Sequence, residues 1–397
     1  MRILNLGEGK SFWVLLLSLF IGLYLLFSMV SISASQIAIS LALFCWIIIL
    51  IRKEQKFSFP SFFWPIIAYV ILSLASSFLS VNPKLSFKDD RELLLFLIVP
   101  IVYEGLASIN ILKKVNLALL ASGYLNCLYA IFYFFFKAYP GERIKSFMGG
   151  QVMTQGGLLM LFSCMALSML IFSKVKIKYL WGLGLILSFF ALILAQTRNA
   201  WVGLVIAVCL TLLIYRPITL ILVPIMIGLF YIASPQPIKK RALSIFNLKD
   251  PINTPRIELW RAGIKIIRDY PIFGTGPNTV EIVYQNPKYE LSEATKKEVH
   301  LHNNILQTAA ERGIPTLLAW LTFMVQAFIN LLKLLKNKDP ALHALTVAAL
   351  AAILGLNVAG LFEYNFADAE ITMLFLYMIT IPFALARILE KTEPHPA

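Results

Sequence analysis

The chain has 397 residues, of which 59% are hydrophobic and only 14% are charged, and its formal net charge is +14. Soluble domains carry about 25% charged residues, so this composition excludes an ordinary soluble protein and indicates a multi-pass membrane protein. In a soluble protein the positive charge could favour nucleic acid, but much of it lies here in short loops between apolar runs, so we expect membrane lipids and no nucleic-acid partner.

Apolar runs of about 16 to 22 residues, the length that a bilayer requires, recur along the chain. The first run lacks a convincing cleavage site, so we interpret it as a retained helix rather than a signal peptide. The runs predict an all-α integral membrane protein with about twelve transmembrane helices, at 12–31, 34–51, 61–81, 92–108, 115–136, 153–173, 179–196, 200–215, 217–234, 314–335, 341–361 and 370–387.

The loops between these runs predict the orientation. With the N-terminus in the cytoplasm every inside loop is basic, as the positive-inside rule expects, and an even number of helices puts both termini inside. The short last outside loop, 362–369, holds the acids Glu363 and Asp368 and no base. We therefore expect a transmembrane bundle of nine helices over 1–234, one long outer loop with interfacial helices over 235–313, and a bundle of three helices over 314–397.

The long loop contains a segment, 257–268, with helical periodicity. Its apolar and basic residues occupy different faces, which predicts a helix lying in the membrane interface, although the basic face could simply meet anionic headgroups. The apolar face comprises Ile257, Trp260, Ile264 and Ile267, with Trp260 as the anchor, and the basic face comprises Arg261, Lys265 and Arg268.

The residues that follow predict a turn. Asp269, Tyr270 and Pro271 end the helix, and Gly274 and Gly276 come next. A Gly-x-Gly pattern is a weak phosphate-binding signal when no strand precedes it, so plain turn chemistry is the simpler interpretation.

The stretch 300–316 closes the loop and carries two of the four histidines. Asn303 or Asn304 can cap a helix that Gly313 and Pro315 then stop. At this helix start the dipole would disfavour protonation of His302, and a neutral imidazole is what a general base needs. The alternative is that His302 only caps or packs.

Three arginines on the outer side could bind an anion. Arg198 interrupts two apolar runs, where an arginine is costly unless it is paired or reaches the interface. It would act either as a phosphate clamp or as a snorkelling turn residue, because a guanidinium binds phosphate at two points. Arg256, which could also be a solvated loop residue, and Arg143, the weaker candidate, would add positive charge.

No metal or cofactor site is expected. The outer side has neither a His-Glu-x-x-His nor an Asp-x-Asp pattern, and Asp89 and Asp90 stand between Lys88 and Arg91, which favours local ion pairs. All four cysteines lie in apolar segments, so neither a disulfide framework nor a cysteine zinc site is predicted.

Three motifs occur here in the same order as in one known family. Thr197-Arg198-Asn199-Ala200 opens a membrane helix, and Arg256-Ile257-Glu258-Leu259-Trp260 leads to the turn with Gly274 and Gly276. His302-Asn303 is followed after nine residues by Gly313 and after two more by Thr316. From about Lys137 to Phe366 the chain resembles the O-antigen ligase family, whereas before about residue 130 only the helical pattern matches.

This resemblance implies a C-type glycosyltransferase of the bacterial inner membrane. Such an enzyme takes a glycan from a polyprenyl (undecaprenyl) pyrophosphate donor at the periplasmic face, without a metal ion or another cofactor. It implies that His302 accepts the proton of an acceptor hydroxyl and that Arg198 and Arg256 hold the pyrophosphate, with Arg261 as a possible replacement for Arg256. Asn303, Gly313, Thr316, Trp260, Gly274 and Gly276 would support the motifs.

Ligation of O-antigen to lipid A-core in lipopolysaccharide biosynthesis is the favoured function. The same resemblance covers O-antigen polymerases and protein O-oligosaccharyltransferases, so another glycan or a protein acceptor stays an alternative. A membrane transporter, a different class, could also have twelve spans. Transporters place their ionisable residues near the midplane, however, and here these residues lie on the outer face.

Overall fold

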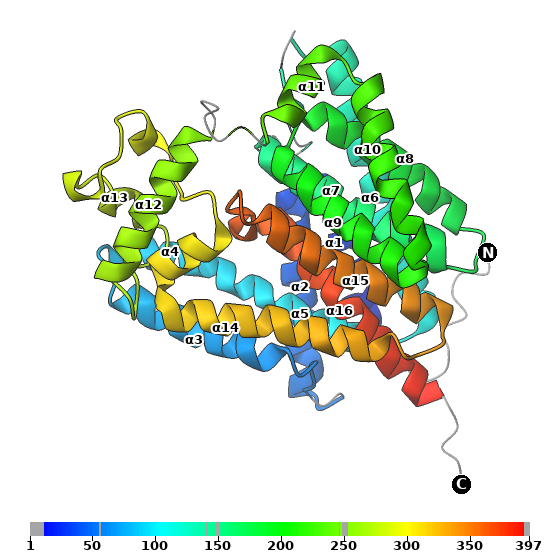
Figure 1. Ribbon diagram of the computed structural model, residues 1–397. Coiled ribbons are helices and arrows are strands. Elements are labelled where there is room, and N and C mark those ends of the chain that lie inside the picture. Colours follow the sequence, from blue (N-terminus) through cyan, green and yellow to red (C-terminus); the bar gives the residue numbers. More distant parts are fainter. Residues whose placement is uncertain are drawn as a thin grey trace.

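The computed structural model describes residues 12–54, 57–139, 142–145, 147, 151–245, 247 and 253–392. Within these residues all regular structure is helical and no strand occurs, which confirms the all-α prediction. The long helices form one bundle (Figure 1). Of the short helices of the long loop, those over Thr254–Asp269 and Val280–Val283 lie together at one end of it, whereas the one over Gln236–Leu243 lies apart from them.

The elements up to the long loop are α1 (Phe12–Phe27), α2 (Ile32–Ile51), α3 (Phe63–Phe78), α4 (Pro83–Asp89), the 3₁₀ helix η1 (Asp90–Leu97), α5 (Ile98–Gly105), α6 (Ile109–Phe136), α7 (Val152–Phe172), α8 (Lys178–Ala195), α9 (Arg198–Tyr215), η2 (Pro217–Ile221) and α10 (Leu222–Ala233). The remaining elements are α11 (Gln236–Leu243), α12 (Thr254–Asp269), α13 (Val280–Val283), η3 (Pro287–Tyr289), η4 (Thr295–Lys297), α14 (Asn304–Leu334), α15 (Pro340–Ala359), η5 (Asn365–Ala367) and α16 (Ala369–Thr392).

Eight of the described helices are long and apolar enough to cross a membrane, namely α2, α6, α7, α8, α9, α14, α15 and α16. Three shorter apolar segments, α1, α3 and η2 with α10, occupy further predicted spans. The predicted span 92–108 differs, because it is divided between η1 and the eight-residue α5. Pro100 lacks the N–H that would close the helix across this junction. The multi-pass architecture is thus confirmed, whereas the number twelve is not.

Close helix packing at the centre depends on small residues. The buried side of α15 is rich in alanine, and Gly355 of α15 faces Gly203 of α9. A Cβ at Gly203 would come within 2.5 Å of the Gly355 carbonyl oxygen. Between membrane helices the lipid provides no hydrophobic driving force, so small residues that let backbones approach give the packing its contacts.

The long loop has a small apolar core of its own. Its members come from α12, from the segments after it and from the start of α14: Leu259, Ala262, Ile266, Val280, Tyr284, Tyr289, Leu291, Leu301 and Ala310. The predicted helix over 257–268 is confirmed as part of α12. It faces the protein with Leu259, Ala262 and Ile266, while Ile264 is exposed, so its position in the membrane interface stays a prediction.

Helix α14 joins this loop to the membrane bundle, and the helix is broken at this junction. Gly313 has a non-helical backbone, with φ of 82°. Pro315 has no N–H to donate to the carbonyl of Glu311, and the N–H of Ile314 instead donates to the Pro271 carbonyl at 2.9 Å. The predicted stop at this point is therefore a break, after which the helix continues into the membrane.

The turn after Pro271 satisfies the carbonyls that the break leaves free. The N–H of Thr275 donates to Ala310 at 2.9 Å, and that of Gly276 donates to Glu311 at 2.8 Å. Gly274 and Gly276 have φ of 67° and 103°, and a Cβ at Gly274 would meet the Glu311 backbone. The glycines let two backbones approach each other, which is turn chemistry and fits the simpler interpretation of the Gly-x-Gly pattern.

This break predicts a marked effect of Gly313→Ala. The new Cβ would clash with the Ile272 carbonyl in a backbone conformation that alanine rarely adopts, so we expect the free energy of unfolding to fall by more than about 1 kcal/mol. Thermal unfolding of the detergent-purified protein measures this. Gly228→Ala in α10, where a Cβ meets open space, is the matched control, and equal unfolding temperatures for both variants would contradict the prediction.

Candidate active site

His302 lies immediately before α14, in an uncommon conformation. Asn303 is the N-cap, and its side chain accepts from the N–H groups of Ile305 and Leu306, which confirms the predicted helix start. The N–H of Asn304 donates to Gly360 at the end of α15, at 2.7 Å. His302 has φ of 49°, a left-handed conformation that costs a non-glycine residue about 1–3 kcal/mol and often accompanies a functional site.

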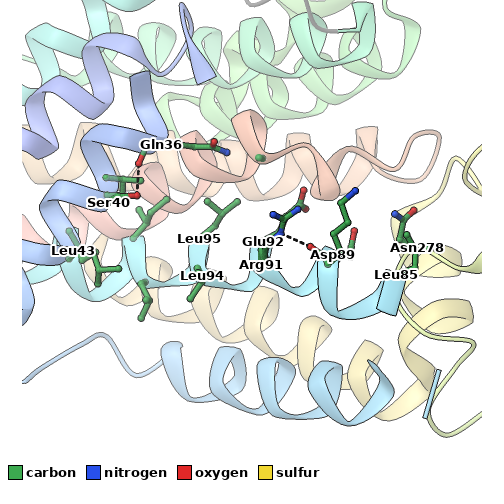
Figure 2. A pocket seen from close by; sticks show the side chains of 16 residues that line it. Gln36, Ser40, Leu43, Leu85, Asp89, Arg91, Glu92, Leu94, Leu95 and Asn278 are labelled. Atoms are coloured by element: carbon green, nitrogen blue, oxygen red, sulfur yellow. Dashed lines mark hydrogen bonds between the residues drawn. The ribbon is translucent and has the colours of Figure 1, made fainter. Parts of the chain in front are cut away.

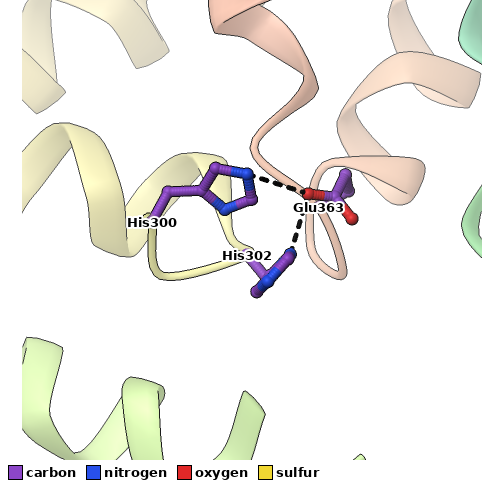
Figure 3. A group of neighbouring side chains, drawn as sticks. All are labelled: His300, His302 and Glu363. Carbon is purple, nitrogen blue, oxygen red and sulfur yellow. Dashed lines mark hydrogen bonds and ion pairs between the residues drawn. The ribbon is translucent and has the colours of Figure 1, made fainter. Parts of the chain in front are cut away.

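Two carboxylates contact the imidazole of His302, as Figure 3 shows for Glu363. Nδ1 lies 2.8 Å from Oε1 of Glu363, and Nε2 lies 3.1 Å from Oε2 of Glu298. Only 15% of the His302 side chain is exposed, whereas 43% of that of Glu298 is. Glu363 therefore holds one ring nitrogen from within the protein, and the other nitrogen faces a more accessible group.

Glu363 is the residue on which the site converges, and sequence reasoning did not single it out. It lies in the short loop between α15 and α16 with a side chain that is 4% exposed. Besides His302 it contacts Arg256 at 3.3 Å and His300 at 3.6 Å. The available signal was an acid in the last outside loop with no base beside it.

Burial and the neighbouring carboxylates together determine the pKa values of His300 and His302. Burial alone would lower the pKa of His302, but the hydrogen bond and charge of Glu363 outweigh burial, so the pKa is raised above 6.5. The expectation that the helix start favours the neutral ring was thus wrong, because the carboxylates dominate. Burial lowers the pKa of His300. Burial would raise the pKa of Glu363, but His302, His300 and Arg256 together lower it.

Arg198, the first residue of α9, is 7% exposed and points into the long loop. Its Nη1 donates to Oγ of Ser244 at 2.8 Å, and its Nη2 donates to Oδ1 of Asn253 at 2.9 Å. These hydrogen bonds orient the guanidinium towards the long loop. The snorkelling interpretation fits this burial poorly.

Arg143 and Arg241 approach the same region from other segments. Arg143 donates to the carbonyls of Ala195 and Gln196 at 3.2 and 3.1 Å, and Arg241 donates to Gln196 at 3.4 Å. These carbonyls end α8, where Gln196 is left-handed (φ 51°) and the helix dipole is negative. Arg241, on α11, was not singled out from the sequence, where it is one base in a run of three.

The four guanidiniums form what we call the arginine cluster: Arg143, Arg198, Arg241 and Arg256. Burial, and after it the charges of Arg241, Arg198 and Arg256, lower the pKa of Arg143 to about 10, and Glu363 offsets only part of this effect. Such a concentration of positive charge favours a multivalent anion, and a guanidinium matches phosphate oxygens at two points.

The structure does not bring Arg261 into this cluster. Arg261 is exposed on α12, and it acts electrostatically on Glu258. Its neighbour Trp260 lies against Phe362, with ring centroids 6.3 Å apart. Trp260 thus supports the loop that carries Glu363, whereas Arg256 provides the positive charge there.

The two aspartates of the first outer segment pair with a distant arginine rather than with Lys88 or Arg91. Asp89 and Asp90 lie 2.9 and 3.4 Å from Arg312 of α14. The expected local ion pairs were therefore wrong, because a buried guanidinium one residue before the break attracts both carboxylates. Thr316 donates to the Arg312 carbonyl at 2.6 Å, which fixes the helix beyond the break.

Three side chains could supply ligands to a metal ion, although the sequence predicted no such site. His300, His302 and Glu363 place one ligand atom each within 4.8 Å of one another. A set of two histidines and a glutamate can bind zinc. Here, however, Arg256 already pairs with the same carboxylate, and the rest of the arginine cluster adds positive charge that opposes a cation.

The comparison with known families fits this geometry. Residues 183–321 match the O-antigen ligase family. The matched segment contains Arg198, Arg241, Arg256 and His302, whereas Arg143 and Glu363 lie outside it. Members of the O-antigen ligase family are membrane glycosyltransferases and ligases, so the resemblance drawn from the motifs is confirmed. No curated protein matches the chain.

The contact between Glu363 and His302 predicts a change in the histidine pKa. Glu363→Gln removes the negative charge that raises the pKa of His302, so we expect the pKa to fall and the neutral ring to persist to lower pH. Histidine-ring NMR titration of the detergent-solubilised protein measures this. Glu293→Gln, at the surface of the long loop, is the control, and a His302 titration that is the same in both variants would disprove the pairing.

Proposed function

We propose that the chain transfers a glycan from polyprenyl pyrophosphate to an acceptor hydroxyl, and that the reaction is ligation of O-antigen to lipid A-core. The observation that carries the proposal is the buried pair of His302 and Glu363 beside the arginine cluster. A base next to a preformed anion site matches this reaction, in which a proton leaves the acceptor while a pyrophosphate leaves the donor.

His302 and Glu363 would activate the acceptor. With Nδ1 held by Glu363, Nε2 of the neutral ring takes the proton as the acceptor oxygen bonds to the anomeric carbon of the donor sugar. The imidazolium that forms is stabilised by the carboxylate, and such general-base action contributes about 10²–10⁴-fold to the rate. Glu298 contacts Nε2 in this structure, and the acceptor hydroxyl would displace it from this nitrogen.

The arginine cluster would receive the leaving group. As the bond between the anomeric carbon and the phosphate oxygen breaks, its electron pair becomes negative charge on the pyrophosphate. Guanidiniums that are already oriented stabilise this charge without reorganisation, and such electrostatic stabilisation often contributes more to catalysis than any other effect. Pyrophosphate is a good leaving group, so the proposed step uses neither ATP nor a metal ion.

We place the site at the periplasmic face of the inner membrane, which the basic loops on the opposite side support. Glu293→Cys, in the long loop, should therefore react with an impermeant thiol reagent in intact cells after the outer membrane is opened, because this side chain is 87% exposed. Lys176→Cys should react only after lysis. The unmodified chain is the control for its own four cysteines, and labelling of Lys176→Cys in intact cells would reverse the orientation.

The two histidines should differ in their effect on transfer. His302→Ala should reduce the rate at pH 7 by about 100-fold or more, since the base is lost, whereas His300→Ala should keep at least about a tenth of the activity because it only packs beside Glu363. The assay is transfer from purified undecaprenyl-pyrophosphate glycan to lipid A-core. A well-folded His302→Ala protein that transfers at nearly the wild-type rate would remove the base from the mechanism.

Arg198 tests the anion site. Arg198→Ala should abolish transfer while the protein stays in the membrane, and Arg198→Lys should rescue it poorly, because an ammonium lacks the planar fork that grips phosphate at two points. The same transfer assay serves, with Arg261→Lys as the control at an exposed position. Full activity of Arg198→Lys would argue against a clamp.

A further inference from the structure

A groove lies on the side of the bundle formed by α2, α4, η1 and α5. It is a cavity of about 560 Å³, within the usual range for a small-molecule site. In Figure 2 Asn278 and Leu85 lie at one end, Asp89, Arg91 and Glu92 follow, and Leu95, Leu94 and Leu43 extend towards the other end. The apolar wall comprises Leu43, Leu94, Leu95, Leu97, Ile98 and Ile101.

The polar end of the groove offers cations and groups that bind hydroxyls. Neither Lys88 nor Arg91 is in an ion pair with any residue that the structure describes, although the Nε of Arg91 donates to the Lys88 carbonyl at 2.9 Å. The carboxylate of Asp89 is already paired with Arg312. Lys88 and Arg91 can therefore receive a phosphate, while the carboxylate of Glu92 and the amide of Asn278 can bind sugar hydroxyls.

A second hollow continues the groove around α2. It has a volume of about 340 Å³ and is lined by Ser33, Gln36, Ile37, Ser40 and Leu41. Gln36 and Ser40 line both hollows. The apolar residues Ile37 and Leu41 are exposed. Two adjoining hollows give room for more than one hydrocarbon chain of the same lipid.

The groove and the arginine cluster are built from different helices. Arg198 and Arg241 come from α9 and α11, whereas the groove is formed by α2, α4, η1 and α5. Helix α16 packs against α5 and η1 and also against α15 and α7, which in turn pack against α9. Ala369, which lines the groove and begins α16, follows Glu363 by six residues. A reaction between two lipid-borne substrates requires two separate binding places.

We propose that this groove binds the lipid portion of the acceptor, a phosphorylated glycolipid with several hydrocarbon chains. Its phosphate contacts Lys88 and Arg91, its sugar contacts Glu92 and Asn278, and its chains lie along the leucine wall. The assignment rests on the proposed function, since it makes the bound lipid the acceptor, and it adds the place where that acceptor binds and the residues that recognise it.

Binding of lipid A to the full-length, detergent-solubilised protein tests this. Leu94→Trp fills the groove, and the pair Lys88→Gln and Arg91→Gln removes the phosphate contacts, so each should weaken binding by about tenfold or more. Leu125→Trp, at a half-exposed leucine of α6 away from the groove, is the matched control and should stay within about twofold. In the transfer assay the groove variants should raise KM for the acceptor and leave kcat and KM for the donor unchanged.

Two outcomes would overturn the proposal. One is lipid A binding with the same dissociation constant to the groove variants and to Leu125→Trp. The other is phosphatidylglycerol binding as tightly as lipid A, which would mean that the groove holds a structural phospholipid. If the groove variants lose lipid A as expected but the wild-type protein transfers no glycan, the groove assignment stands and the proposed function fails, so the two failures are distinguishable.

Discussion

A single buried carboxylate, that of Glu363, organises the outer end of the bundle. A buried charge is tolerated only when opposite charge and hydrogen bonds surround it, and here His302 and Arg256 provide them from the start of α14 and from α12. Because both partners belong to the long loop whereas Glu363 lies between two helices of the membrane bundle, the carboxylate also ties the two parts together. Removing it would leave a histidine without orientation and an arginine without a counter-charge.

The arginine cluster is a concentration of positive charge, in contrast to the carboxylate of Glu363. Its guanidiniums repel one another, and the lowered pKa of Arg143 is a consequence. Hydrogen bonds to Ser244 and to the carbonyls that end α8 hold Arg198 and Arg143 in place. An anion that binds there relieves this repulsion, so part of its binding free energy is already present in the fold before the anion arrives.

The sequence alone was sufficient to predict site residues that stand out from their immediate neighbours in the chain. Arg198 interrupts apolar runs and His302 precedes a capped helix, so both can be selected from the order of residues alone. Glu363 and Arg241 could not, because a single charge in a polar loop carries no pattern and acquires its role only through distant contacts. For the same reason the pairing of Asp89 with Arg312, 223 residues away, was missed. The interruption at Gly313 and Pro315 and the membrane span 314–335 after it were both predicted, whereas the hydrogen bonds from the turn that hold the two parts of α14 together were not.

The break in α14 also fixes a length along the chain. His302 is held at the helix start and Gly313 at the break, so the intervening turns act as a rigid spacer between the histidine and the docked loop. One inserted residue would rotate one end against the other by about 100° and lengthen the helix by about 1.5 Å. His302 would then face away from Glu363. A substitution within these turns keeps the spacing, whereas an insertion or deletion of one residue destroys it.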